Sequence, residues 1–196
     1  QHHHLSATLM PFPITERKGR RPLGIFRWAT EPMHASLHFF ANRLGVRSIS
    51  SMKTGRQMAV GDVVWRTKAA VTFEIKIEDY DRPSLDDDKR PRIVVGVVRE
   101  PVSPNTINPR QIPVAQQTPG LANGWGICDA KYALGPNGEK VAVDAARDWK
   151  VGDVVGVHLS PERKTIRFSL NYQDLGIALD VEGGPVRPGV ALFGPQ

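Results

Sequence analysis

The 196-residue sequence has a single cysteine, Cys128, and no long run of apolar residues. One cysteine cannot form a disulfide within the chain or supply a zinc site built from several cysteines, and such low usage is typical of a reducing compartment. A helix that spans a membrane needs about 20 consecutive apolar residues, and no stretch approaches this length. Any contact with a membrane is therefore expected to be peripheral.

Motifs that would indicate catalysis or cofactor binding are also missing. The phosphate-binding patterns GxGxxG and GxxxxGK[ST] do not occur, and neither does GxSxG, which presents a serine nucleophile. The acidic run Asp86–Asp88 lacks the ligand spacing of an EF-hand, and His2–His4 are interpreted as a tail. His158 and Cys128 are interpreted as structural residues. We therefore predict a protein that is not an enzyme and holds no cofactor and no metal.

Positive charge is concentrated in the first third of the chain. Residues 1–60 contain nine Lys and Arg and two Asp and Glu, a net charge of +7, so that residues 61–196 carry −1 of the total of +6. A basic segment of this kind can meet RNA, an acidic protein or anionic lipid. The candidate contact residues of this basic arm are Arg17, Lys18, Arg20 and Arg21.

Residues 1–60 are predicted to form an irregular, basic, Pro/Arg-rich N-terminal extension, because four prolines interrupt any long helix. Within it, Leu37, Phe40 and Leu44 have helical spacing, which predicts a short helix in Ala35–Lys53. This Arg- and Ser-rich, acid-free segment also has the composition of an organelle presequence. An ordinary basic linker, or mature sequence left after an upstream targeting segment was removed, is the alternative.

From residue 61 onward the hydrophobic pattern changes to a period of two. Apolar residues alternate with polar ones in 71–78 and 166–170, which predicts half-buried strands. Two short runs, Ile93–Val98 and Val154–Leu159, are apolar on both faces and are predicted to be central strands. Turn signals separate these segments at short intervals, which favours an all-β, antiparallel β-sandwich for residues 61–196.

Five sequence blocks in this region resemble the SPRY (B30.2-like) family. The family signature pairs a strand that opens with Gly-Asp with a strand that ends in Phe-x-x-Asn, followed by Leu-Gly-x-Ala; here these are Gly152-Asp153, Phe168–Asn171 and Leu175–Ala178. The other matching blocks are Phe73–Ile75, Val95–Val97, Gly124–Gly126 and Arg187–Leu192. The resemblance implies a SPRY (concanavalin-like) sandwich that binds protein partners.

The sequence departs from the family pattern in two places. Tyr172 follows Asn171 where the family usually has glycine, so a different turn geometry is expected there. The segments 79–92 and 101–120 are longer than a minimal sandwich requires. Family members bind partners through such loops at one end of the sandwich. We expect Tyr80, Arg99, Asn123 and Trp125 to form the rim of that end, with a core position as the alternative for Trp125.

These observations predict a non-catalytic protein–protein interaction module. We expect an accessory or structural subunit of a large assembly, inside the cell and in the mitochondrion or otherwise the cytoplasm. One alternative is an RNA-contacting component of a ribonucleoprotein such as a mitochondrial ribosome, with the basic arm on phosphate. A second alternative is a substrate-recognition adaptor for ubiquitin ligation. The fold by itself does not choose the partner.

Overall fold

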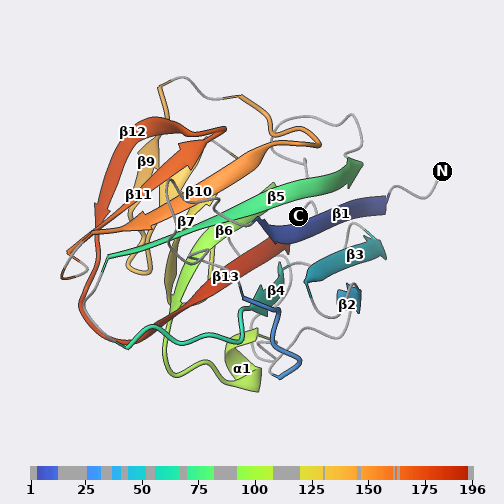
Figure 1. Ribbon diagram of the computed structural model, residues 1–196, viewed down its shortest axis with the longest axis horizontal. Coiled ribbons are helices and arrows are strands. Elements are labelled where there is room, and N and C mark those ends of the chain that lie inside the picture. Colours follow the sequence, from blue (N-terminus) through green and yellow to red (C-terminus); the bar gives the residue numbers. More distant parts are fainter. Residues whose placement is uncertain are drawn as a thin grey trace, which may run out of the picture.

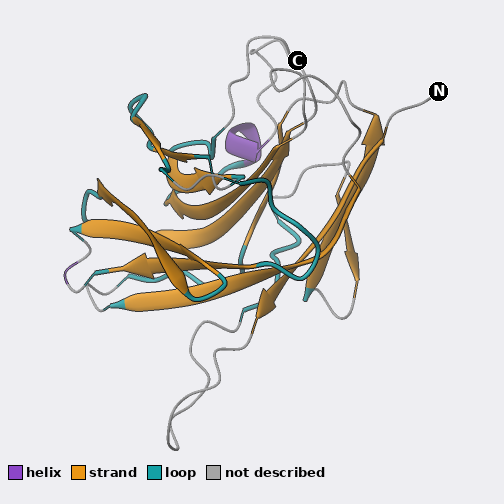
Figure 2. Cartoon of the chain, turned by 90° about the horizontal axis from the view of Figure 1, so that it is seen from above, coloured by secondary structure: helices purple, strands orange, loops and turns teal. Residues whose placement is uncertain are grey.

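The computed structural model describes most of the chain. The described residues are 4–12, 26–31, 37–40, 44–51, 56–66, 70–81, 92–107, 120–129, 131–144, 147–160, 162 and 164–193. They form two antiparallel β-sheets that face each other, with one short helix, α1 (Pro104–Ile107) (Figures 1 and 2). The predicted all-β, antiparallel sandwich is therefore confirmed.

The larger sheet has seven strands in the order β12-β11-β10-β5-β1-β3-β2. Its members are β1 (His4–Phe12), β2 (Leu37–Phe40), β3 (Gly45–Ser51), β5 (Val71–Asp81), β10 (Val154–Leu159), β11 (Thr165–Leu170) and β12 (Gln173–Asp180). Figure 2 shows that this sheet bends, so that β1, β3 and β2 extend past the edge of the other sheet.

The smaller sheet has six strands in the order β4-β13-β6-β7-β8-β9. Its members are β4 (Arg56–Val60), β6 (Arg92–Arg99), β7 (Gly124–Cys128), β8 (Tyr132–Leu134), β9 (Lys140–Ala142) and β13 (Val186–Phe193). The two runs predicted to be central strands are β6 and β10, and both have neighbours on each side. Their apolar character on both faces follows from this position.

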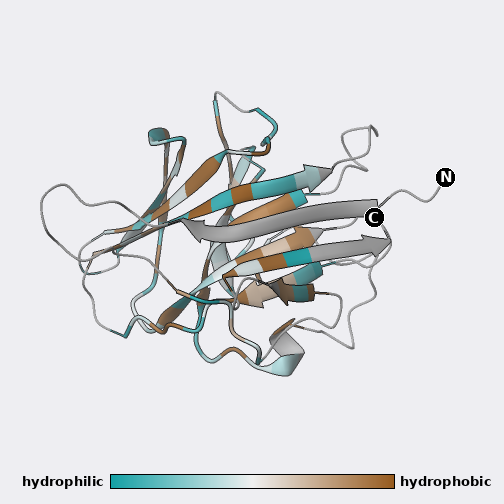
Figure 3. Ribbon diagram, turned by 45° about the vertical axis from the view of Figure 1, so that its right-hand side comes forward, coloured by the Kyte–Doolittle hydropathy of each residue, from teal (hydrophilic) through white to brown (hydrophobic). Residues whose placement is uncertain are grey.

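The main core lies between the two sheets. On β5 the side chains of Phe73, Ile75 and Ile77 are buried, as the alternating pattern predicts, and they face core residues of the other sheet such as Val95 and Ile127. Figure 3 shows the corresponding alternation of hydrophilic and hydrophobic bands along the strands. The inner faces thus meet as expected for aligned sandwich sheets.

The predicted helix in Ala35–Lys53 is wrong, because this segment forms β2 and β3. These strands pair as a hairpin, and β3 also pairs with β1 from His4↔Ser51 to Leu9↔Val46. Sheet pairing satisfies the backbone of residues 45–51, and Leu37 and Val46 bury their side chains in the main core. Tertiary pairing has here overridden a short helical spacing.

Aromatic residues from the first third of the chain pack in the same core. Trp28 is 0% exposed, and its ring lies edge-to-face against Phe26 at 5.3 Å, which in turn meets Phe73 at 5.6 Å. The Ala29 N–H donates to the Val60 carbonyl at 2.8 Å. The division into a 1–60 extension and a 61–196 domain stays a prediction, and the described residues on both sides of it share one core.

A second apolar cluster covers the outer face of the six-stranded sheet. Met58, Val94 and Cys128 from the sheet pack with Ile107 of α1 and with Leu121. Leu121 lies over a part of the sheet that lacks side chains, since a Cβ on Gly124 would be 3.0 Å from the Leu121 Cβ and one on Gly126 would be 3.2 Å from its Cδ1. In the described residues, α1 is the sole helix, and it is too short to cross a membrane.

Candidate binding surface

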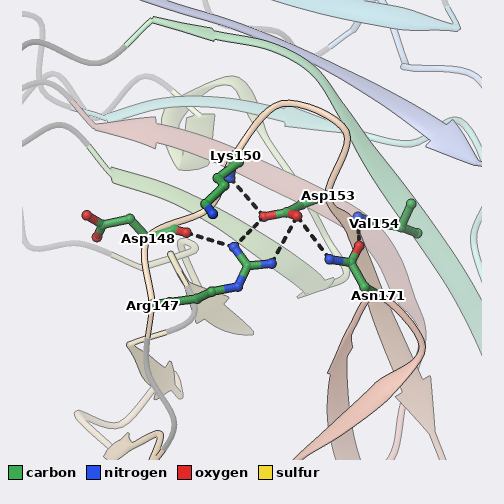
Figure 4. A network of polar contacts seen from close by, with 6 residues as sticks. All are labelled: Arg147, Asp148, Lys150, Asp153, Val154 and Asn171. Atoms are coloured by element: carbon green, nitrogen blue, oxygen red, sulfur yellow. Dashed lines mark hydrogen bonds and ion pairs between the residues drawn. The ribbon is translucent and has the colours of Figure 1, made fainter.

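Asp153 lies at the centre of a hydrogen-bond network at one end of the sandwich, which we call the Asp153 end (Figure 4). Its carboxylate accepts two bonds from the Arg147 guanidinium, at 2.8 and 3.0 Å, and one from the Lys150 N–H at 2.8 Å. Asn171 donates to the same carboxylate at 3.0 Å and accepts from the Val154 N–H at 2.9 Å. The network therefore fastens the segment 147–154 to Asn171, which follows β11.

The signature residues have a physical role in this network. The Gly152-Asp153 turn precedes β10, with Gly152 at φ +92°, and Asn171 directly follows β11. The network therefore joins the turns at the ends of two paired strands. Burial opposes ionisation of Asp153, but the bonds from Arg147, Asn171 and Lys150 outweigh it and hold the pKa of Asp153 below its ordinary value. The hydrogen bond to Asp153 raises the pKa of Arg147. Both groups are charged near neutral pH.

The network holds an unusual hairpin turn between β11 and β12. Leu170 pairs with Gln173, and the two residues between them have positive φ, +50° for Asn171 and +68° for Tyr172, as in a type I′ turn. We expected a different turn geometry because tyrosine replaces glycine; that prediction is wrong. Asn171 is fixed by two bonds, and Tyr172 beside it has the left-handed conformation that favours glycine. Its side chain is 70% exposed.

The same hairpin borders a hollow in the surface. A cavity of about 390 Å³ is lined by residues of the hairpin, among them Asp174 and Leu175, and by Val143, Asp144 and Arg147. Asp174 is held in place by a two-fold contact with Arg167, at 3.0 and 3.2 Å, and by the Gly176 N–H at 2.6 Å. Val151, next to Lys150 of the network, is 57% exposed. Tyrosine and arginine are residue types enriched among binding hot spots, and hollows are where ligands commonly bind.

Three of the four predicted rim residues lie at the opposite end of the sandwich. The Arg99 guanidinium carbon lies 5.0 Å from the centre of the Trp125 ring, and its Nη1 lies 3.2 Å from Glu182. The Arg99 N–H donates to the Asn123 carbonyl at 3.0 Å. Trp125 is only 2% exposed, so it takes the core position that was the alternative.

Tyr80 does not join these three residues. Arg99 pairs with Val186, and Val186 forms a β-bridge with Trp65. The Trp65 ring stacks on Phe73, with 5.5 Å between the ring centres. Arg99 therefore lies at the same end of the sandwich as Phe73 of β5. With a rise of about 3.3 Å per residue, Tyr80 lies roughly 23 Å farther along this strand. Its half-buried ring packs against the main core near the Asp153 end. The four residues therefore do not form one rim.

Other predicted sites fall on residues outside the described part of the chain. These are the basic-arm residues Arg17, Lys18, Arg20 and Arg21, the acidic run Asp86–Asp88, and most of the loops 79–92 and 101–120. Their roles stay predictions.

The two residues interpreted as structural are held within the sheets. His158 approaches Ser169 Oγ at 2.9 Å through Nε2 and Thr72 Oγ1 at 3.3 Å through Nδ1, and burial lowers the pKa of His158. Burial, then the neighbouring Asp129, raises the pKa of Cys128 to about 12, so its thiol is protonated. Such a thiol is a poor nucleophile.

Sequence reasoning found part of the Asp153 end. Asp153 and Asn171 were visible in the family signature, and Tyr172 was visible as a departure from it. Arg147 carried no signal, because it lies in an irregular segment six residues before its partner.

Comparisons with known proteins agree with this architecture. The model of the SPRY domain family matches residues 70–196. The fold is similar to the TRIM65 PSpry domain, with 15% identity, a TM-score of 0.53, and coverage of 86% of this chain and 90% of that one. It is also similar to the SPRY domain of human HERC1, with 15% identity, a TM-score of 0.48, and coverage of 76% and 81%. A search of curated proteins gives no significant match.

Proposed function

The chain belongs to the SPRY domain family, whose members are generally protein–protein interaction modules and typically not catalysts, and we propose that this member binds its protein partner through the Asp153 end. The contact surface consists of Tyr172, Val151, Arg147 and the cavity beside them. It is distinct from the Arg99–Trp125 contact at the opposite end of the sandwich.

The observation that carries this proposal is the conformation of Tyr172. A non-glycine residue in the left-handed region costs about 1–2 kcal/mol, and Tyr172 leaves most of its ring in solvent. Backbone strain of this kind is concentrated at functional sites, where another constraint maintains it. Partner binding supplies a reason for a large aromatic side chain at a position that glycine would fill at lower cost.

The surrounding network supports the same function. Arg147 and Asn171 fix the two turns around Asp153, so the exposed ring is presented from a rigid base. A turn whose backbone is ordered before binding loses less conformational entropy on association. Tyrosine and arginine are also the residue types enriched among binding hot spots.

At the level of the assembly, we propose an accessory subunit of a larger protein complex, with the mitochondrion as the favoured compartment. The support is the positive charge of residues 1–60, since the presequence-like segment Ala35–Lys53 forms β2 and β3 of the folded sandwich. The RNA-contacting and ubiquitin-adaptor alternatives remain open, and they differ in which surface they use. RNA binding would depend on Arg17, Lys18, Arg20 and Arg21, whereas an adaptor would bind exchangeable clients through the sandwich.

Affinity purification of the full chain from its native cells tests the binding surface. The variant is Tyr172→Gly, and the matched control is Lys164→Gln, an exposed cation at the Arg99 end. We expect the co-purifying proteins to be lost with Tyr172→Gly and kept with Lys164→Gln. Because glycine relieves strain at this position, a loss of partners would not reflect misfolding. Retention of all partners by Tyr172→Gly would overturn the proposed surface.

The same purification separates the alternatives. The RNA-contacting alternative is tested with a variant in which Arg17, Lys18, Arg20 and Arg21 are all neutralised, and with ribonuclease treatment. If the partners are lost when the four residues are neutralised, and are also lost from the natural chain when ribonuclease is added, an RNA-contacting subunit is favoured. One stable large complex would favour an accessory subunit, and a changing set of clients would favour an adaptor.

A further inference from the structure

A second, larger cavity opens on the outer face of the six-stranded sheet. Its volume is about 550 Å³, and its lining comes from β4, β6, β7, β8, β9, the β8–β9 turn and the segment 120–123. Ligand pockets in proteins commonly have volumes of about 300–1,000 Å³. This outer cavity shares no lining residue with the cavity at the Asp153 end.

The floor of the outer cavity is apolar. Leu121, Cys128 and Leu134 line it, and Leu121 and Cys128 are nearly fully buried. The protonated thiol of Cys128 contributes to this floor as a small apolar group. The floor therefore suits the hydrocarbon part of a ligand.

Three cationic side chains stand around this floor: Arg56 on β4, Arg92 on β6 and Lys140 on β9. Arg56 and Arg92 both pair with residue 193 of β13, from opposite sides, so they occupy one row of the sheet. Two strand spacings separate their backbones by about 10 Å, a distance that two arginine side chains can bridge. The Lys140 ammonium lies 4.1 Å from the centre of the Tyr132 ring, which holds it at the cavity wall.

Two described anions near the cavity are already engaged within the protein. Glu139 accepts a hydrogen bond from the Asn137 N–H at 2.8 Å and so folds back on its own turn. Asp129 is fully buried behind Arg92, with 3.5 Å between carboxylate and guanidinium. Among the described residues that line the cavity, three side chains are cationic and one, Glu139, is anionic. Burial lowers the pKa of Arg56.

We propose that the outer cavity binds a carboxylate carried on an apolar body, with Arg56, Arg92 and Lys140 around the carboxylate and Leu121, Cys128 and Leu134 against the body. Two sources share this chemistry. One is a free small organic acid, and the other is an acidic side chain next to an apolar one in a peptide.

Titration of the labelled full-length protein, followed by amide chemical shifts in NMR spectra, tests the proposal. The probes are 4-phenylbutyrate, its neutral amide, and the blocked dipeptide N-acetyl-Phe-Glu-amide. We expect saturable shifts at residues 121–123, 128 and 132–140 with a carboxylate probe, and about tenfold weaker binding of the amide, because the amide cannot accept a charge-assisted hydrogen bond. Tighter binding of the free acid or of the dipeptide identifies the source.

The test variants are Arg56→Gln and Lys140→Gln. Arg92 is left in place because its removal would leave the buried Asp129 without this cation. Each variant is expected to weaken binding of the carboxylate probe about tenfold, whereas the exposed control Lys164→Gln is expected to bind it unchanged. If Arg56→Gln does not fold, the comparison of acid with amide on the natural chain still decides. Absence of shifts at millimolar concentrations, equal binding of the amide, or unchanged binding by both folded variants would overturn the proposal.

Discussion

At the residue scale, Tyr172 places an exposed aromatic side chain in a strained backbone conformation. Its φ of +68° is accessible to glycine without strain, and it follows an asparagine that also has positive φ. Asn-Gly is the preferred pair for such a turn. The natural Asn-Tyr pair therefore stores strain that a single substitution can release.

We predict that Tyr172→Gly stabilises the protein by roughly 1 kcal/mol, which raises the Tm by about 2–4 °C for a chain of this size. The measurement is thermal unfolding followed by circular dichroism. Tyr172→Ala is the control, because alanine keeps the Cβ and hence the strain. A Tm for Tyr172→Gly at or below the natural value would contradict a strained turn.

Asp153 makes the fold sensitive to acid. Because its pKa in the folded protein lies below the unfolded value of about 3.9, its contribution to stability is complete above that pH and is lost as the pH falls further. We predict that Asp153→Asn costs about 2 kcal/mol at pH 7. The difference from the natural protein should shrink below about pH 4.

Urea unfolding at pH 7, 5 and 3 measures this dependence. Asp180→Asn removes an exposed carboxylate of β12 and serves as the control. A cost for Asp153→Asn that is the same at all three pH values would show that the ionised carboxylate is not the stabilising group.

At the scale of the strands, Gly96 allows β6 and β7 to pair closely. A Cβ at this position would collide with the backbone of Trp125 and Gly126. We predict that Gly96→Ala destabilises the fold by about 1–3 kcal/mol, because backbone cannot yield as the end of a side chain can. Gly183→Ala is the matched control, since a Cβ there meets nothing within 4 Å. Denaturant unfolding of both variants checks the difference.

The strands show which parts of the fold could be predicted from the sequence. Alternation in 71–78 and the apolar runs 93–98 and 154–159 predicted β5, β6 and β10. A strand buried on one face has apolar residues at every second position, and a strand buried on both faces is apolar throughout. The predicted helix in 35–53 was wrong because the helical spacing of Leu37, Phe40 and Leu44 is a local signal. The structure of this segment depends on the pairing of β3 with β1, which lies about 40 residues earlier in the chain.

The site was harder to predict than the fold. Tyr80 and Arg99 were predicted to lie at one end of the sandwich, but the two ends of a β-strand lie at opposite ends of the sandwich. β5 and β6 are joined by a loop beside Tyr80 and Arg92, so Arg99 lies at the far end of β6. The Arg147–Asp153 pair needs three-dimensional placement that no short motif encodes.

At the scale of the whole molecule, residues before and after position 60 are one packed unit. Trp28 is fully buried and reaches the core of both sheets through Phe26, Phe73 and Trp65. We predict that Trp28→Ala costs about 3–5 kcal/mol in unfolding free energy, as expected for an aromatic residue removed from a core. Equilibrium unfolding in urea measures the change.

The control for Trp28→Ala is Arg27→Ala at the neighbouring exposed position, which is expected to cost far less. Equal costs for both would indicate that the segment 26–29 is not packed as described. A practical consequence follows for work on the basic arm. Substitution of its arginines is the suitable test, because deletion of residues 1–60 would also remove Trp28 and β4.

The place of β1 in the larger sheet also bears on how the chain folds during its own synthesis. β1 pairs with β5 on one side, and Ser6 is opposite Asp81. A ribosome adds about 5–20 residues per second, so roughly 60 residues, or about 3–12 seconds of translation, separate the emergence of the two partners. For that interval one flank of the nascent β1–β3–β2 unit presents unpaired backbone groups, which makes it the segment that a chaperone is best placed to shield.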